Sequence, residues 1–156
     1  MIFSQNGIEL LKRVEGPSPH LYNDSAGLPT IGVGHLLTRD ELSSGKINIL
    51  GISIRYSGGL METQIEKLLA HDVAFAEGAV SMCDVNLTQN QFDALVCFVF
   101  NVGRGAFNQS TLKKHLVAGN LNKIPEQLRR WIYAGGKISK GLIGRREQEI
   151  KLFLTE

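Results

Sequence analysis

The chain has 156 residues, of which 43% are hydrophobic and 21% are charged. This composition excludes a disordered chain, and no apolar run approaches the length of a membrane span. The two cysteines, Cys83 and Cys97, form no CxxC pair and are too few for a disulfide framework, which favours reduced thiols in a cytosolic protein.

The net charge is only +2, but it is unevenly distributed along the chain. Residues 113–156 hold ten Lys and Arg against four Asp and Glu, a net charge of +6, whereas residues 1–112 carry −4. A basic C-terminal third indicates attraction to a polyanion without identifying it. The first residues, MIFSQNGIELLKRVEG, lack the continuous apolar stretch of a signal peptide.

The first part of the chain mixes helical and strand patterns. Apolar residues at three- and four-residue spacings predict a helix over residues 4–15, ended by Gly16-Pro17. Residues 20–37 hold two β-prone pieces around a turn-rich tetrad and predict a hairpin. A capping-box pattern at residues 38–41 predicts a short helix. Residues 46–59 predict a second small hairpin or β extension.

The rest of the chain has helical patterns only. Periodicity predicts a helix over residues 62–80. A second capping box opens a helix over residues 88–103 that is apolar almost all round and is therefore expected to be buried. Three further helices are expected, over residues 110–120, 125–133 and 144–154. Ser110 can cap the first of them, and Pro125 fits the first turn of the second.

These elements predict an α+β protein with one domain over residues 1–156. A small lobe with β-hairpins is expected at about residues 15–60, and a larger all-helical lobe at about residues 61–156. The apolar stripe of the first helix suits packing on the helical lobe. A cleft between two lobes is the default place for a ligand.

Two acidic residues are distinguished by their predicted surroundings. Glu15 falls at the end of a helix, where the partial negative charge disfavours a carboxylate, although a solvated helix end is the commoner role of such a residue. Asp24 falls in the hairpin turn, where backbone N–H groups and water keep a carboxylate ionised. Glycosidic hydrolysis needs such an unequal pair, one group protonating the leaving oxygen and the other acting on water or the sugar carbon. The hydroxyl of Thr30, on the strand facing Asp24, can orient that water.

The segment that contains these residues reads EGPSPHLYNDSAGLPTIGVGH. Together with LTQNQFDALVCFVFNVGRGAF, STLKKHL and GLIGRREQE, it closely resembles the phage-type (T4-like) lysozymes that serve as endolysins, and most closely those of lambdoid-type phages. The resemblance covers nearly the whole chain. It implies a lysozyme-like two-lobe fold and a muramidase that hydrolyses the β-1,4 bond between N-acetylmuramic acid and N-acetylglucosamine in peptidoglycan.

The resemblance also assigns roles to particular residues. It implies that Glu15 is the general acid, Asp24 the second catalytic residue and Thr30 the threonine that orients water. Leu36, Phe100 and Ser110 fall where family members line the saccharide groove. Core packing is an equal alternative for Leu36 and Phe100, and helix capping for Ser110.

The resemblance further implies the partners and location. Peptidoglycan is the expected substrate, with no cofactor, no nucleic acid and a monomeric enzyme. With no signal peptide, the enzyme is expected to remain in the host cytoplasm until a holin-like membrane pore releases it to the periplasm and cell wall. The histidines lack HExxH spacing, so no metal site is expected.

Other possibilities stay open at this stage. A lytic transglycosylase needs one acid and no water, and a non-catalytic module that binds a wall glycan would also use the basic stretch. Likeness to the T4 protein favours inversion of configuration over retention. It also favours an ion pair between His35 and Asp72 over a neutral core histidine.

Overall fold

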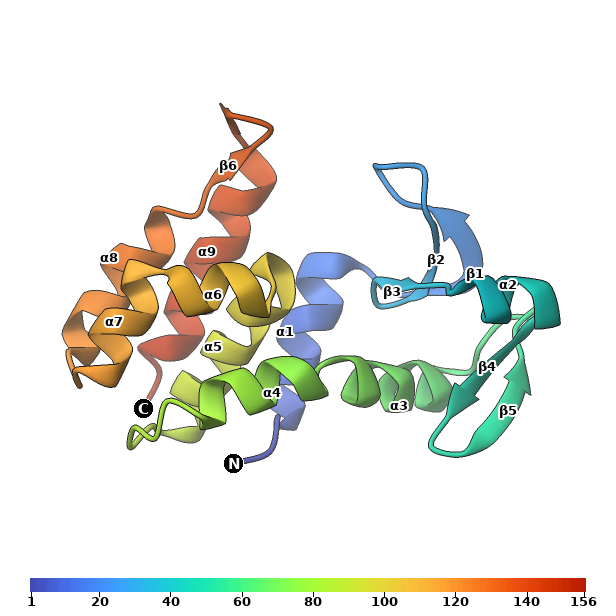
Figure 1. Ribbon diagram of the computed structural model, residues 1–156, viewed down its shortest axis with the longest axis horizontal. Coiled ribbons are helices and arrows are strands. Elements are labelled where there is room, and N and C mark those ends of the chain that lie inside the picture. The colour runs from blue at the N-terminus through green and yellow to red at the C-terminus, as the bar shows by residue number, and fades with distance from the viewer. The chain divides into compact units, whose positions relative to one another are not determined.

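A computed structural model describes all 156 residues, and the chain divides into two compact units (Figure 1). One unit is Leu11–Asp72, and the other combines Met1–Leu10 with Val73–Glu156. The first unit thus extends beyond the boundary expected near residue 60. The first helix, α1 (Gln5–Glu15), contributes residues to both units.

The unit Leu11–Asp72 holds two antiparallel sheets and two helices after α1. Three strands pair in chain order in one sheet, and two strands form a hairpin. In Figure 1 these elements run from blue to green. The elements are β1 (Ser18–Asn23), β2 (Pro29–Gly32), β3 (His35–Leu36), α2 (Arg39–Ser44), β4 (Lys46–Ile49), β5 (Ile52–Arg55) and α3 (Glu62–Asp72).

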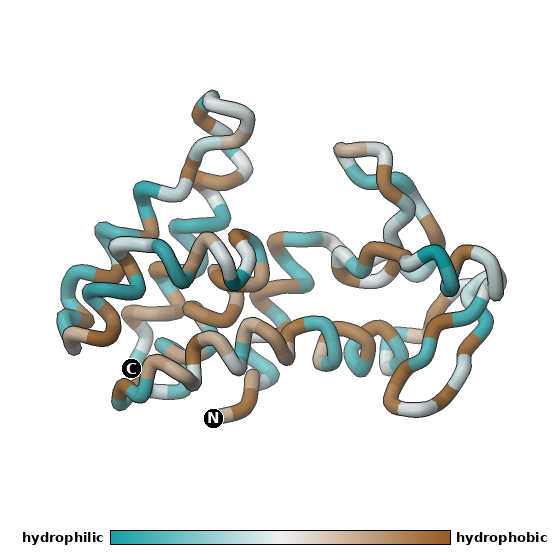
Figure 2. The backbone as a smooth tube through the Cα atoms, viewed as in Figure 1, coloured by the Kyte–Doolittle hydropathy of each residue, from teal (hydrophilic) through white to brown (hydrophobic).

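The predicted second hairpin is confirmed as β4–β5. Hydrophobic and hydrophilic residues alternate along β4, as Figure 2 shows, and this places Ile47 and Ile49 on the buried face. The turn joins the strands through Leu50 and Gly51, whose φ angles are 53° and 82°. Positive φ at both turn residues matches the twist of a two-residue hairpin.

The other unit is mainly helical. Its central helix, α5, has every residue from Phe92 to Val99 buried and contacts α4 and α9. The predicted buried helix is thereby confirmed. The elements are α4 (Ala74–Ser81), α5 (Gln89–Val102), α6 (Arg104–Gln109), α7 (Thr111–Val117), the 3-10 turn η1 (Leu121–Lys123), α8 (Ile124–Arg129), β6 (Tyr133–Ala134), β7 (Lys137–Ile138) and α9 (Lys140–Phe153).

Some elements differ from the sequence predictions. The helix expected over residues 62–80 is broken at the buried Val73, where the chain passes between units. The short α6 was not expected. The helix expected over residues 125–133 ends at Arg129, ahead of the β6–β7 hairpin. The last helix begins earlier than expected because the Ser139 side chain caps it.

The start of α1 is anchored by a buried carboxylate of α5. The backbone N–H of Ser4 donates to Oδ1 of Asp93 at 3.0 Å, and the Ser4 hydroxyl donates to Oδ2. Gln89 Nε2 donates to the same Oδ1 at 2.9 Å. These donors satisfy the hydrogen-bonding capacity of a carboxylate that would otherwise be costly to bury. None of the helices combines the length and apolar character that a membrane span requires.

Candidate active site

Glu15 is the last residue of α1, as predicted. The helix stops because Gly16 adopts a left-handed φ of 74° and its N–H donates to the Lys12 carbonyl at 3.0 Å. The Lys12 ammonium also pairs with α3, at 2.9 Å from Glu62 and 3.2 Å from Glu66. The last turn of α1, and with it Glu15, is thereby held against α3.

Asp24 lies in the β1–β2 turn and is fixed by backbone donors. Its Oδ1 accepts from Ala26 N at 2.8 Å and from Leu28 N at 2.9 Å. The Asp24 N–H donates to the Leu28 carbonyl at 2.9 Å. Oδ2 accepts from no protein group, so it is available to water or a ligand. The prediction that backbone N–H groups surround Asp24 in a turn is confirmed.

Thr30 lies in β2, where it is only 2% exposed. Its Cα pairs with that of Tyr22 in β1, and its hydroxyl donates to the Leu28 carbonyl at 2.9 Å. The hydroxyl oxygen can still accept a hydrogen bond. Thr30 therefore follows the turn that holds Asp24, on the opposite strand, as expected.

Tyr22 is a residue near both carboxylates that the sequence interpretation did not identify. Burial raises the pKa of its phenol, and the negative charges of Glu15 and Asp24 raise it further. The structure thus brings Glu15 and Asp24 into electrostatic range of one side chain. The available signal was the Tyr-x-Asp spacing, because alternate residues of a strand share a face.

The turn between β2 and β3 lies beside the Glu15 carboxylate. Gly32 and Gly34 have φ angles of 65° and 72°, which other residues rarely adopt. A Cβ added at Gly34 would lie 3.8 Å from Oε2 of Glu15, an ordinary contact. These glycines are therefore required by backbone conformation rather than by lack of space.

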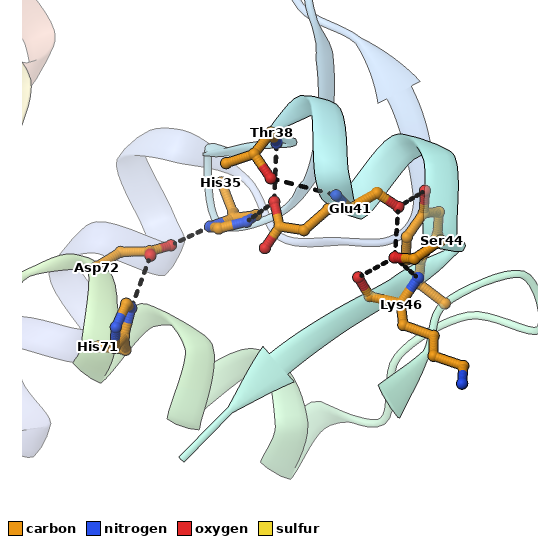
Figure 3. A network of polar contacts seen from close by, with 8 residues as sticks. His35, Thr38, Glu41, Ser44, Lys46, His71 and Asp72 are labelled. Atoms are coloured by element: carbon orange, nitrogen blue, oxygen red, sulfur yellow. Dashed lines mark hydrogen bonds and ion pairs between the residues drawn. The ribbon is translucent and has the colours of Figure 1, made fainter. Parts of the chain in front are cut away.

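His35 forms the predicted pair with Asp72. Nδ1 of His35 lies 2.9 Å from Oδ2 of Asp72, and Nε2 lies 3.3 Å from Oε2 of Glu41 (Figure 3). Burial opposes the charged ring, but the hydrogen bonds and charges of the two carboxylates outweigh it and raise the pKa of His35. The pairing prediction is confirmed, because both ring nitrogens of His35 face carboxylates.

Glu41 is a partner of His35 that the sequence interpretation missed. It was identified only as the third helical residue of the capping box, a role that the structure confirms through Thr38. Burial opposes its charge, but the Thr38 N–H and the His35 ring outweigh burial and lower the pKa of Glu41. The cap of α2 and the histidine pair thus form one network.

Neither apolar groove candidate is plain core. Leu36 is 50% exposed at the end of β3. Phe100 is half-buried on α5 and stacks on Phe75, with ring centroids 6.3 Å apart and planes 26° apart. Phe75 is itself 43% exposed. The core-packing alternative is wrong for Leu36, and Phe100 belongs to a partly open aromatic pair.

Ser110 caps α7, as the capping alternative predicted. Its hydroxyl accepts from Lys113 N at 3.0 Å and donates to the Phe107 carbonyl at 2.7 Å. The same residue lines a pocket of about 480 Å³ together with the buried Gln127 and with Trp131. The sequence predicted only a helix with proline in its first turn for this segment, and Gln127 was not identified.

The candidate residues fall into two groups. Glu15, Asp24, Thr30 and Leu36 belong to the unit Leu11–Asp72. Phe100 and Ser110 belong to the helical unit. No three His, Cys, Asp or Glu side chains gather into a group that would hold a metal ion.

Comparison with known proteins gives one consistent family. The family model described as phage lysozyme matches residues 12–149. The endolysin of Salmonella phage P22 is 38% identical over 156 residues, covering 99% of each chain. The endolysin of Bacillus phage B103 is 40% identical over 158 residues, which are 99% of this chain and 55% of that one. The chain thus spans about half the length of this relative.

Solved structures give the same result. A crystal structure of a variant of P22 lysozyme superposes with a TM-score of 0.83 at 36% identity, covering 99% of both chains. The muramidase domain of SpmX from Asticaccaulis excentricus gives 0.78 at 31% identity, covering 99% of this chain and 98% of that one.

Proposed function

Because the chain belongs to the phage lysozyme family, we propose that it is a muramidase that acts as an endolysin. It hydrolyses the β-1,4 bond between N-acetylmuramic acid and N-acetylglucosamine in peptidoglycan. The α+β, lysozyme-like fold class predicted from the sequence is confirmed by the solved relatives. The observation that carries the proposal is the match of the phage lysozyme family model over residues 12–149, which include Glu15 and Asp24.

Glu15 acts as the general acid and protonates the oxygen of the departing sugar. Two features support this role. Glu15 is the last residue of α1 and its carboxylate lies beside the β2–β3 turn, and the ion pairs of Lys12 link the last turn of this helix to α3.

Asp24 acts as the base that activates water. Its Oδ1 is held by two backbone N–H groups, whereas Oδ2 faces no protein donor and can accept from a water molecule. Thr30 orients the same water through its hydroxyl oxygen, because its proton is already donated to the Leu28 carbonyl.

The glycan contacts come from the exposed or pocket-lining candidates. Leu36 and the Phe75–Phe100 pair offer apolar surface for the faces of sugar rings. Ser110 and Gln127 offer polar groups in the pocket of the helical unit. Because it lines this pocket, Gln127 is added to the candidate residues that were predicted from the sequence.

The basic charge of residues 113–156 supports the same substrate. Peptidoglycan carries negative charge, and a positive surface raises the rate of encounter at low salt. We infer that the enzyme is monomeric, starts in the host cytoplasm and reaches the wall through a holin-like pore.

Cleavage of solubilised peptidoglycan tests the proposal. New reducing ends at the muramic acid residue are expected, together with clearing of outer-membrane-permeabilised bacteria. Anhydro ends in their place would establish a lytic transglycosylase. Binding without cleavage would establish a wall-binding module.

A further inference from the structure

Tyr22 is placed by the hairpin on the same face as two candidate catalytic residues. The β1–β2 register pairs its Cα with that of Thr30. Asp24 lies two residues after Tyr22, and its N–H continues the ladder by donating to Leu28 O. Cross-strand partners share a face of the sheet, as do residues two apart. The side chains of Tyr22, Asp24 and Thr30 are therefore on one face.

The Glu15 carboxylate lies beside this sheet. Its Oε2 is close to Gly34 in the turn after β2, and its charge acts on the Tyr22 phenol together with the charge of Asp24. Both charges, like burial, favour the neutral phenol. The Tyr22 hydroxyl therefore keeps its proton throughout the pH range in which carboxylates titrate.

The hydroxyl of Tyr22 is an uncommitted donor. It forms no hydrogen bond to another protein group, although a partly buried tyrosine usually has a partner. Tyr56, in the same unit, illustrates the usual case, since its hydroxyl donates to the Glu41 carbonyl at 2.9 Å. Oδ2 of Asp24 is an acceptor without a protein donor. One face thus holds a donor and an acceptor that are both unused.

We propose that Tyr22 is a positioning residue, whose hydroxyl donates to Asp24 through one water. This water-mediated hydrogen bond stabilises the ionised form of Asp24, the form that acts as the base. Tyr22 thereby sets the pH below which kcat/KM falls. The kinetic consequence rests on the proposed muramidase function.

The first test compares the pH dependence of kcat/KM for wild type and Tyr22→Phe on solubilised peptidoglycan. Without the donor, the acidic limb is expected to move upward by about one pH unit, which corresponds to a hydrogen bond to a charged group. The maximal kcat is expected to fall several-fold, with KM nearly unchanged. An acidic limb that stays at its wild-type pH overturns the proposal.

Tyr56→Phe is the matched control. This variant also deletes a phenolic hydroxyl from a tyrosine of the same unit. Because the hydroxyl of the buried Tyr56 donates to the Glu41 carbonyl, its loss lowers the melting temperature. Its pH profile is expected to coincide with that of wild type. An equal shift in Tyr56→Phe would assign the effect to general destabilisation and contradict the proposal.

A second measurement does not depend on catalysis. The ¹³C shift of the Asp24 carboxyl is followed against pH in the resting protein, for wild type and Tyr22→Phe. The midpoint of this titration is expected to rise in the variant, and an unchanged midpoint overturns the proposal even if no glycan is cleaved. If wild type produces no reducing ends while the midpoint still rises, the muramidase function fails and the positioning role stands.

Discussion

Nδ1 of His35, in β3, lies 2.9 Å from Oδ2 of Asp72, the last residue of α3, and thereby joins a sheet to a helix within one unit. The side chains are only 13% and 16% exposed, so water screens the pair weakly. A second carboxylate, Glu41, approaches the other ring nitrogen. The pair is therefore a titratable part of the fold.

Asp72→Asn is expected to cost stability in a pH-dependent way. The pKa of His35 is raised, so its contribution is complete below the unfolded value of about 6.5 and is lost as pH rises through the folded value. We expect a loss of about 2 kcal/mol at mildly acidic pH, close to a charged hydrogen bond, and a smaller loss at alkaline pH. Thermal melts across pH measure it.

His71→Gln is the control for this variant, because His71 also contacts Asp72, at 3.4 Å, but is 64% exposed. It is expected to leave the pH dependence unchanged. A loss in Asp72→Asn that is no larger in acid than in alkali would mean that His35 contributes by packing alone.

Glu41→Gln separates the charge of Glu41 from its capping role. A glutamine at this position still closes the box, as Gln91 does at the start of α5. We expect a loss of about 0.5–1 kcal/mol near pH 6 that disappears at alkaline pH, where His35 is neutral. The depressed pKa of Glu41 adds a lower limit: its contribution is present above its unfolded pKa and is lost as pH falls through the folded value.

The reverse exchange, Gln91→Glu, controls for the swap itself. It changes the same pair of residue types in a capping box that contains no histidine. The two variants are compared by chemical denaturation at several pH values. Equal pH dependence in both would exclude a specific contribution from His35.

Glu15→Gln is expected to lower lysis at least about 100-fold, the usual contribution of a general acid. The exchange preserves side-chain shape and removes only the proton donor, so the circular dichroism spectrum should match that of wild type. Lysis is measured by turbidity of permeabilised bacteria. Residual activity above a tenth of wild type would remove Glu15 from the role of acid.

The anomer released first reports the role of Asp24. With Asp24 as base, water attacks the face opposite the leaving group and inverts the configuration, and the carboxyl groups of Glu15 and Asp24 are expected to lie roughly 6.5–9.5 Å apart. An NMR time course should therefore show the α-anomer first. Early appearance of the β-anomer would instead make Asp24 a nucleophile in a retaining mechanism.

Ser110→Ala tests the pocket of the helical unit. Loss of the cap is expected to cost about 1 kcal/mol. Thr88→Ala removes a comparable cap from the start of α5, and Thr88 does not line the pocket that contains Ser110. If Ser110 also contacts glycan, Ser110→Ala raises KM and Thr88→Ala does not. Equal KM values would limit Ser110 to capping.

The sequence was sufficient where a local rule decides the structure. Both capping boxes, the β4–β5 hairpin and the buried α5 depend on residues close in sequence, and all are present. The places of Glu15 at a helix end and of Asp24 in a turn were also predicted from local features, whereas their catalytic roles came from the family resemblance. Their roles remain predictions.

The parts that were missed depend on distant contacts. The break at Val73 reflects a change of packing partner, which helical periodicity does not encode. Glu41 meets His35 only after β3 and α2 are in place, and Tyr22 acquires significance only through the β1–β2 register. Gln127 reaches the pocket of Ser110 through the packing of α7 with α8.

The order of synthesis has a consequence for the helical unit. Met1–Leu10 is synthesised before Val73–Glu156, the segment that holds its partners, and Ser4 contacts Asp93 across 89 positions. Domains tend to fold from the N-terminus as they emerge, and long-range contacts form slowly. The segment Leu11–Asp72 is thus fully made while the first residues of α1 still lack their partners. A nascent chain that has not yet exposed Asp93 cannot form the contact that anchors the start of α1, so the helical unit is completed only after Leu11–Asp72 has been synthesised.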